Sequence, residues 1–213
     1  ARLSRLNSKK FADIKKKYGM VSHDTTTCGL HVTVDRAGMN GLHQSKLVKF
    51  INDLANKPLV TAVCRRYAEG YCKIKSEHYN KLSRVNDNLV AMRDRYEILN
   101  MTHAKVFEFR GPKGTLRFES IMAAVEFIRM AWFFTKDAPI NKLDTPTFLD
   151  FIWKVENRED SKYLREYLAA RKFEGVYEEV RGVVDPKTPR RLSLTDAYAD
   201  AVAAGHVATT ADY

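Results

Sequence analysis

Three residues of this sequence combine the chemical types that can hold a metal ion and a phosphate. His31 supplies an imidazole, Glu108 a carboxylate and Arg110 a guanidinium. Imidazoles and carboxylates are common ligands of divalent metals, and a guanidinium binds phosphate or carboxylate through paired hydrogen bonds. The three can act together only if folding brings them onto one surface.

Two segments with alternating apolar residues carry these side chains. Apolar residues at every second position are typical of a strand with one buried face. That face is expected to carry Cys28, Leu30, Val32 and Val34 in segment 28–35, and Lys105, Phe107 and Phe109 in segment 104–111. If it packs against helices, the opposite face carries His31, Thr33, Asp35, Val106, Glu108 and Arg110.

Other catalytic motifs are weak in this chain. The glycines lack the spacing and the strand-to-helix context of a phosphate-binding loop. Cys28 precedes His31 by three positions, but a catalytic pair is defined in space, so this spacing alone does not indicate one. The remaining histidines have polar neighbours and are expected at the surface: His23, His43, His78, His103 and His206.

The net charge and the cysteine count of the chain bear on its partners and its cellular compartment. A net charge of +10 over 213 residues allows a nucleic acid, an anionic substrate such as a nucleotide, or an acidic protein as partner. The odd count of 3 cysteines argues against a disulfide framework and for a reducing compartment. A zinc site would require a closely spaced pair of cysteines or histidines, and the sequence contains none.

Neither a membrane span nor a signal peptide is expected. The longest apolar segment, 121–134, is interrupted by Glu126 and Arg129. The sequence begins at Ala1, which removal of an initiator methionine, proteolysis or a start inside a longer protein would each explain.

Helical periodicity and turn residues divide the chain into four parts. We expect a basic N-terminal helix or arm (1–21), a part with the strands and several helices (22–135), a helical region (136–204) and a tail (205–213). Helices, few strands and no repeat indicate the α+β class.

Individual elements follow from the same patterns. Gly19 is expected to end the first helix, Lys57 and Pro58 to begin a new one, and Thr115 to cap a long central helix. The second helix should bury Leu47, Phe50, Ile51 and Leu54. Helices are expected at 1–18, 44–56, 57–67, 116–135, 147–156, 160–171, 174–180 and 192–204, with 93–101 as strand or extended loop.

Four short segments together resemble the putative amidoligase family. They are GLHVTV (29–34), RYEILN (95–100), FEFR (107–110) and GTL (114–116), and they occur in the order typical of that family. The resemblance covers about residues 22–135. These proteins are carboxylate–amine ligases of the glutamine synthetase-like superfamily, common in bacteria and their phages.

The resemblance implies a fold, a reaction and roles for residues. The fold is a partial antiparallel glutamine synthetase-like sheet backed by helices, followed by a helical C-terminal third. The reaction forms an amide from a small carboxylate and an amine, with ATP and Mg²⁺ and an acyl phosphate intermediate. By the same resemblance, His31 and Glu108 are metal-site residues, Arg110 and Arg95 are catalytic, and Thr33, Tyr96 and Asn100 bind substrate or nucleotide.

The chain departs from the family pattern in two places. Thr33 stands where the family has a second histidine, and the 27 residues before the first strand lack the acidic pair of the N-terminal half-sheet. That half is expected on another chain or on another part of the gene product, or it has been lost.

Two other functions remain open from the sequence. One is a catalytically inactive structural or assembly protein on the same fold, such as a component of a phage particle. The other is a nucleic-acid-binding module that uses the basic residues of 1–17 together with Arg65 and Arg66. The expected location is the cytoplasm or a phage particle.

Overall fold

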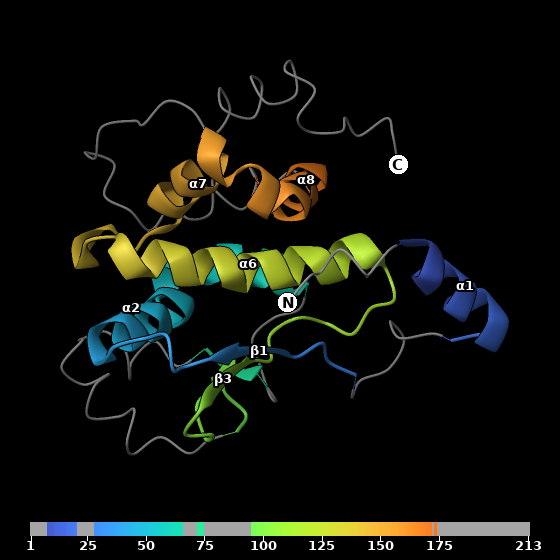
Figure 1. Cartoon of the computed structure of the whole chain (residues 1–213), viewed down its shortest axis with the longest axis horizontal. Helices are drawn as coiled ribbons and strands as arrows, with labels where there is room; N and C mark the ends of the chain where they lie inside the picture. Colours follow the sequence, from blue (N-terminus) through green and yellow to red (C-terminus); the bar gives the residue numbers. More distant parts are fainter. Residues whose placement is uncertain (1–7, 21–27, 66–71, 75–94, 172, 174–213) are drawn as a thin grey trace.

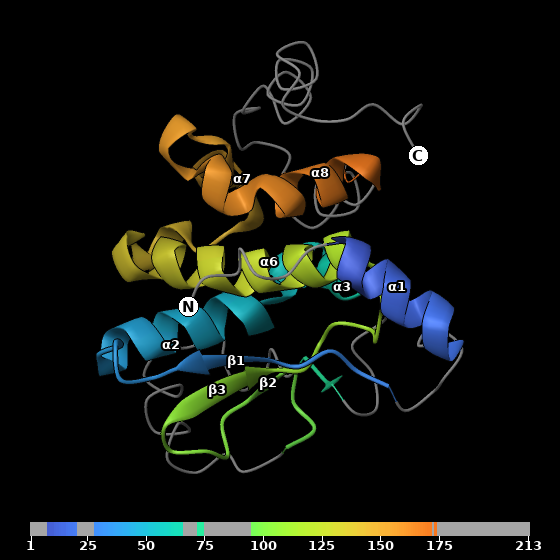
Figure 2. The same cartoon turned by 45° about the vertical axis from the view of Figure 1, so that its right-hand side comes forward.

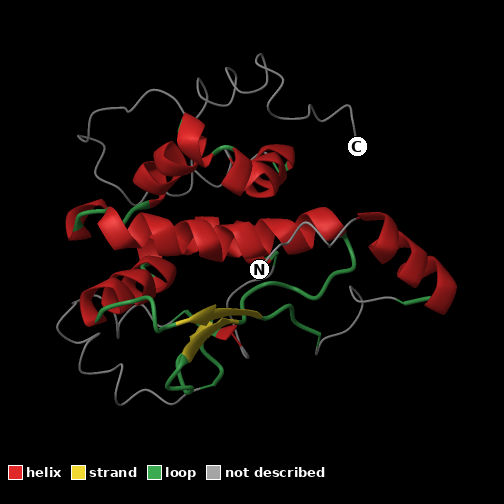
Figure 3. Ribbon diagram, viewed as in Figure 1, coloured by secondary structure: helices red, strands yellow, loops and turns green. Residues whose placement is uncertain are grey.

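The computed structural model of the chain describes residues 8–20, 28–65, 72–74, 95–171 and 173. Within these residues the protein has six α-helices and one three-stranded antiparallel sheet, which confirms the α+β class (Figures 1 and 3). The elements are α1 (Ser8–Tyr18), β1 (Val32–Asp35), α2 (Gly41–Asn52), α3 (Lys57–Cys64), β2 (Leu99–Asn100), β3 (Val106–Phe109), α6 (Phe118–Asp137), α7 (Thr145–Trp153) and α8 (Lys162–Ala170).

The strands lie in the order β1-β3-β2, with β3 in the centre. Phe107 and Phe109 are completely buried on the helix side, and Val32 and Val34 pack against the same core. The alternation predicted for these four residues is therefore confirmed. Cys28, expected on the same face, is exposed, because the regular strand begins only at Val32.

Helix α6 is the centre of the fold. It runs between α2 and the sheet on one side and α7 and α8 on the other (Figures 1 and 2). The ring of Phe127 on α6 lies 5.6 Å from that of Phe109 on the sheet and 5.8 Å from that of Phe148 on α7. One aromatic side chain thus joins the two layers, and the predicted central helix is confirmed.

No membrane span is found in the part of the chain that the structure describes. Even α6, with 20 residues, does not combine the length and the apolar composition that a span requires.

Helix α2 begins and ends earlier than the periodicity predicts. Its first turn is capped by the side-chain oxygen of Asn40, which accepts the N–H of His43 at 2.8 Å. Leu47 and Phe50 are buried as predicted, as is Ile51, but Leu54 is 59% exposed, so its predicted place in the core is wrong. The helix stops at Asn52, which breaks the periodicity.

The predicted end of α1 and the predicted start of α3 are confirmed, whereas the predicted start of α6 is wrong. Gly19 ends α1 with a φ of +57°, and Pro58 lies in the first turn of α3, as predicted. Thr115 is not the cap of α6, because the chain stays extended through Arg117. The hydroxyl of Thr115 instead accepts the N–H of Arg117 at 3.1 Å.

The remaining boundaries differ from the prediction by a few residues. The strand within 93–101 is only Leu99–Asn100. Helices α7 and α8 take the places expected at 147–156 and 160–171. The helices predicted at 174–180 and 192–204, and the tail 205–213, lie outside the described residues.

His43 is buried, not at the surface as its polar neighbours suggested. It is 5% exposed, and its Nε2 lies 2.9 Å from the carbonyl oxygen of Trp132 near the end of α6. Burial lowers the pKa of His43, which favours the neutral ring with Nε2–H as donor. The sequence showed only the polar neighbours along the chain, whereas the covering residues come from α6.

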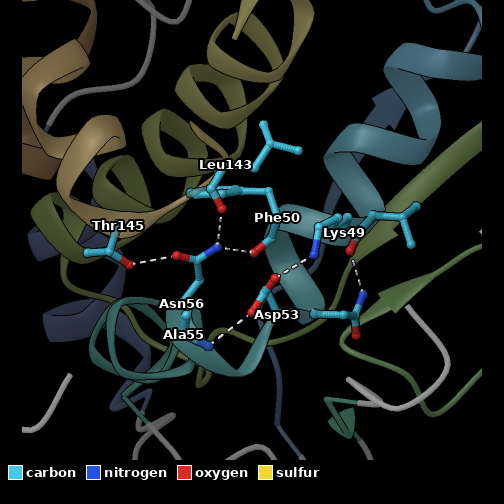
Figure 4. Close-up of polar contacts among 9 residues, drawn as sticks. Lys49, Phe50, Asp53, Ala55, Asn56, Leu143 and Thr145 are labelled. Carbon is cyan, nitrogen blue, oxygen red and sulfur yellow. Dashed lines mark hydrogen bonds and ion pairs between the residues drawn. The ribbon is translucent and has the colours of Figure 1, made fainter. Parts of the chain in front are cut away.

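Asn56 joins the segment after α2 to the loop before α7 (Figure 4). Its amide nitrogen donates to the carbonyl oxygens of Phe50 and Leu143, at 3.1 and 2.9 Å. Its amide oxygen accepts the hydroxyl of Thr145 at 2.9 Å. Asn56 and Thr145 are completely buried. Two backbone carbonyls and one hydroxyl, all without access to water, thus have their hydrogen bonds to a single side-chain amide.

Gly111 packs where a side chain has no room. A Cβ at this position would overlap Sγ of Cys64 and lie 3.0 Å from Cγ1 of Ile98. We expect Gly111→Ala to lower the free energy of unfolding by about 2 kcal/mol through overpacking. Urea denaturation measures this change.

The control for this prediction is Gly38→Ala, since a Cβ there meets Trp132 at an ordinary 3.5 Å. That variant should stay within about 0.5 kcal/mol of the parent. Because Sγ of Cys64 causes the overlap, Gly111→Ala should cost less in a Cys64→Ala background. An equal cost in both backgrounds would contradict this account.

Candidate functional site

The face of the sheet that points away from the helices carries a row of polar residues. Glu108 on the central strand β3 is opposite Thr33 on β1 and opposite Asn100 on β2. Residues opposite one another on neighbouring strands have side chains on the same face. Side chains from all three strands therefore meet at Glu108.

Both carboxylate oxygens of Glu108 are engaged. Oε1 lies 2.8 Å from Nδ1 of His31. Oε2 accepts a hydrogen bond from Nδ2 of Asn100 at 2.9 Å and another from Nη1 of Arg110 at 3.0 Å. The sequence-based expectation that His31, Glu108 and Arg110 share one face is confirmed, and Asn100 joins them.

These contacts determine the charge state of Glu108. Partial burial raises the pKa of Glu108, but the hydrogen bonds from Asn100 and Arg110, together with nearby positive charge, outweigh it, so the pKa is lowered. The carboxylate is therefore ionised at neutral pH and can only accept hydrogen bonds. Nδ1 of His31 must then carry a proton, and Nε2 is the nitrogen that can accept one.

The four side chains differ in their access to solvent. His31 is 38% exposed, Glu108 22% and Arg110 20%, whereas Asn100 is only 4% exposed. The amide oxygen of Asn100 accepts the N–H of Thr102 at 2.9 Å, which directs its nitrogen toward Glu108. The histidine is the member of the group most open to a ligand.

Arg95 and Tyr96 form a separate pair. The guanidinium of Arg95 lies over the ring of Tyr96, 4.9 Å from its centroid, and donates to its hydroxyl at 2.8 Å. Arg95 is exposed, and its described contacts are with Tyr96 and not with Glu108. Thr33 is exposed on the same face as Glu108. The structure thus brings five of the seven predicted residues together: His31, Thr33, Asn100, Glu108 and Arg110.

The described residues do not form a metal centre by themselves. Among them no group of three histidine, cysteine, aspartate or glutamate side chains could hold a metal ion. His31 and Glu108 are bound to each other, and Oε2 of Glu108 is already occupied by two donors. The magnesium implied by the family resemblance would need ligands beyond these residues.

Arg36 supports the site and was not predicted. It follows β1 and donates to the side-chain oxygen of Gln44 at 2.7 Å and to the carbonyl of His103 at 3.2 Å. Its guanidinium also lies 4.7 Å from the ring centroid of Phe107. Arg36 therefore ties the end of β1 to the loop between β2 and β3. No local sequence signal indicates these partners, because His103 lies 67 positions away.

Comparison with known proteins gave no relatives. No known family model, curated protein or solved structure matches this chain.

Proposed function

We propose that this chain carries part of the active site of an ATP-dependent carboxylate–amine ligase of the amidoligase type. The observation that supports the proposal is the group His31, Asn100, Glu108 and Arg110 on one sheet face. These residues come from three of the four segments that resemble the family. A chance resemblance of short motifs gives no reason for them to meet at one carboxylate.

The proposed chemistry begins with activation of a carboxylate. ATP transfers its terminal phosphoryl group to the substrate carboxylate, which gives an acyl phosphate and ADP. The amine then attacks the acyl carbon, the new C–N bond forms, and the bond from carbon to the phosphate oxygen breaks. Inorganic phosphate leaves with the electron pair, and the amine loses one proton.

His31 is the proposed acceptor of that proton. Glu108 holds Nδ1–H, so Nε2 is available as a general base, and the carboxylate stabilises the imidazolium that forms. Asn100 and Arg110 hold Glu108 in place. Arg110 also supplies positive charge beside the reacting phosphate, where charge stabilisation contributes most.

A non-catalytic scaffold is the second candidate. It is supported by the same contacts, because Glu108 links all three strands and a fully engaged carboxylate can be purely structural. A structural or assembly protein on this fold would use Glu108 only to hold β1 and β2 to β3.

Glu108→Gln separates the two functions. Gln can present an amide N–H to His31 and no longer fixes its tautomer, so a ligase should lose at least about 100-fold in kcat. The measurement is release of phosphate from ATP that depends on added carboxylate and amine, with the complete gene product. Thermal unfolding of the same sample shows whether the variant folds.

The matched control is Asp53→Asn, which removes a carboxylate paired with Lys49 on α2, away from the sheet. It should leave phosphate release unchanged. If Glu108→Gln lowers only the stability and the parent shows no substrate-dependent turnover of ATP, the scaffold is correct and the ligase is excluded.

A further inference from the structure

Three arginines gather where the ends of three helices meet. Arg65 ends α3, Arg117 immediately precedes α6, and Arg171 follows α8. Figure 2 shows α3, α8 and the first turns of α6 at the same end of the molecule.

Contacts between these elements hold the cluster together. The hydroxyl of Tyr167 on α8 lies 3.3 Å from the carbonyl oxygen of Ala62 on α3. The guanidinium of Arg171 lies 4.5 Å from the ring centroid of Tyr167. Arg65 donates from Nη2 to the carbonyl of Lys113 at 2.8 Å, four positions before Arg117. The arrangement is therefore fixed by the contact between α8 and α3 and by the contacts of Arg65 and Arg171 themselves.

The positive charge of this cluster is not balanced by the residues that the structure describes. None of the three arginines forms an ion pair with a described carboxylate. Burial lowers the pKa of Arg65, and the charges of Arg171 and Arg117 lower it further. Burial raises the pKa of Tyr167 to about 12, so its hydroxyl stays neutral and supplies no negative charge. Within the described residues, three cations thus interact with one another without a paired carboxylate.

Two backbone features lie at this cluster. Helix α6 is 20 residues long and begins after Arg117 without a side-chain cap, so its positive dipole end lies at the cluster, where the negative C-terminal ends of α3 and α8 also lie. Arg65 has a φ of +58°, the left-handed conformation that L side chains rarely adopt. In this conformation Arg65 ends α3, and its backbone N–H donates to the carbonyl of Thr61.

We propose that Arg65, Arg117 and Arg171 form a binding site for a phosphoryl group. Planar guanidinium groups bind phosphate oxygens in pairs, and three of them supply more than enough positive charge to neutralise one phosphate. The site lies on the helix side of the sheet, whereas His31 and Glu108 lie on the opposite face. It is thus a second anion site and does not depend on the proposed ligase activity.

The phosphoryl group could belong to a free phosphorylated molecule or to a nucleic-acid backbone, and the test distinguishes them. The variant is Arg117→Gln with Arg171→Gln, because both side chains are exposed and their loss leaves the core intact. Arg65 stays in place because it also bonds to Lys113. The matched control is Lys57→Gln with Lys142→Gln, which removes two exposed charges, one at the first residue of α3 and one in the short 3₁₀ helix that follows α6.

The probes are pyrophosphate, by titration calorimetry, and a fluorescent single-stranded oligothymidylate, by anisotropy, both with the full chain at constant ionic strength. We expect the arginine variant to bind at least one probe about 20-fold or more weakly than the parent. The lysine variant should bind the same probe less than about twofold more weakly than the parent. Loss confined to pyrophosphate indicates a free ligand. Loss confined to the oligonucleotide, with a smaller salt dependence in the variant, indicates a nucleic-acid backbone. Failure of the parent to bind either probe, or equal weakening by both variants, overturns the proposal.

Discussion

The free energy of unfolding is expected to fall by about 4 kcal/mol between about pH 5 and pH 8, owing to one residue, Glu126. Burial raises the pKa of Glu126 to about 8, from an ordinary value of 4.5. The residue is 5% exposed on α6, and its Oε2 accepts the N–H of Leu164 at 2.7 Å, in the first turn of α8. The carboxyl group thus caps a neighbouring helix from inside the core.

The sign of the effect follows from proton binding. Below pH 4.5 the folded and unfolded chains both hold the proton, and the contribution of Glu126 is fully present. Between that pH and about 8 only the folded chain holds it, so each pH unit lowers the stability by about 1.4 kcal/mol. The contribution is lost as the pH rises through the folded-state pKa.

Glu126→Gln tests this account by removing the titration while keeping an oxygen for the helix N–H groups. The variant should match the parent within about 1 kcal/mol at low pH and exceed it by about 3 kcal/mol or more near pH 8. Urea unfolding across this range measures both. Glu119→Gln on the same helix controls for loss of one negative charge. A difference between parent and Glu126→Gln that does not change with pH would show that Glu126 has an ordinary pKa.

Asn56→Ala is expected to lower the free energy of unfolding by about 3 kcal/mol. The variant leaves the carbonyls of Phe50 and Leu143 and the hydroxyl of Thr145 without their partner (Figure 4). Because the site is completely buried, water cannot replace the lost amide without rearrangement. Chemical denaturation at neutral pH gives the value.

Asn157→Ala provides a matched comparison, since Asn157 is only partly buried and donates one side-chain hydrogen bond, to the carbonyl of Phe151 at 2.7 Å. It should cost about 1 kcal/mol. Asn56→Asp should be at least as harmful as Asn56→Ala, because a carboxylate oxygen would then face two carbonyls. If Asn56→Ala costs no more than Asn157→Ala, the network does not stabilise the fold as described.

The spacing of apolar residues in the sequence correctly predicted the buried face of an element where buried residues recur at regular intervals along it. The alternation around Phe107 and Phe109 identified the buried face of β3, and with it the opposite face that carries Glu108. Periodicity failed at Leu54, since a capping interaction ended α2 before that residue. A pattern can predict which face is buried, but it cannot predict where competing hydrogen bonds stop an element.

The spacing of residues in the sequence did not predict the hydrogen-bond partners of the polar side chains. Glu126 interrupts an apolar segment, and from the sequence this indicated only that the segment does not span a membrane. Its hydrogen-bond donor, the backbone N–H of Leu164, is 38 positions away in the chain. Asn56 and Leu143 are 87 positions apart. The motif resemblance did group His31, Glu108 and Asn100, but it did not indicate that Glu108 would bind the other two.

The strand order has a consequence for how the protein folds. Strand β1 pairs with β3 across roughly 70 residues of chain, and closing a loop of that length costs about 4 kcal/mol of entropy. Helices α2 and α3 lie inside this interval and pack on α6, which shortens the loop that remains to be closed. We therefore expect β1 to pair with β3 after α2 and α3 have packed on α6. We therefore expect the contact between His31 and Glu108 to form late in folding, together with the pairing of β1 and β3.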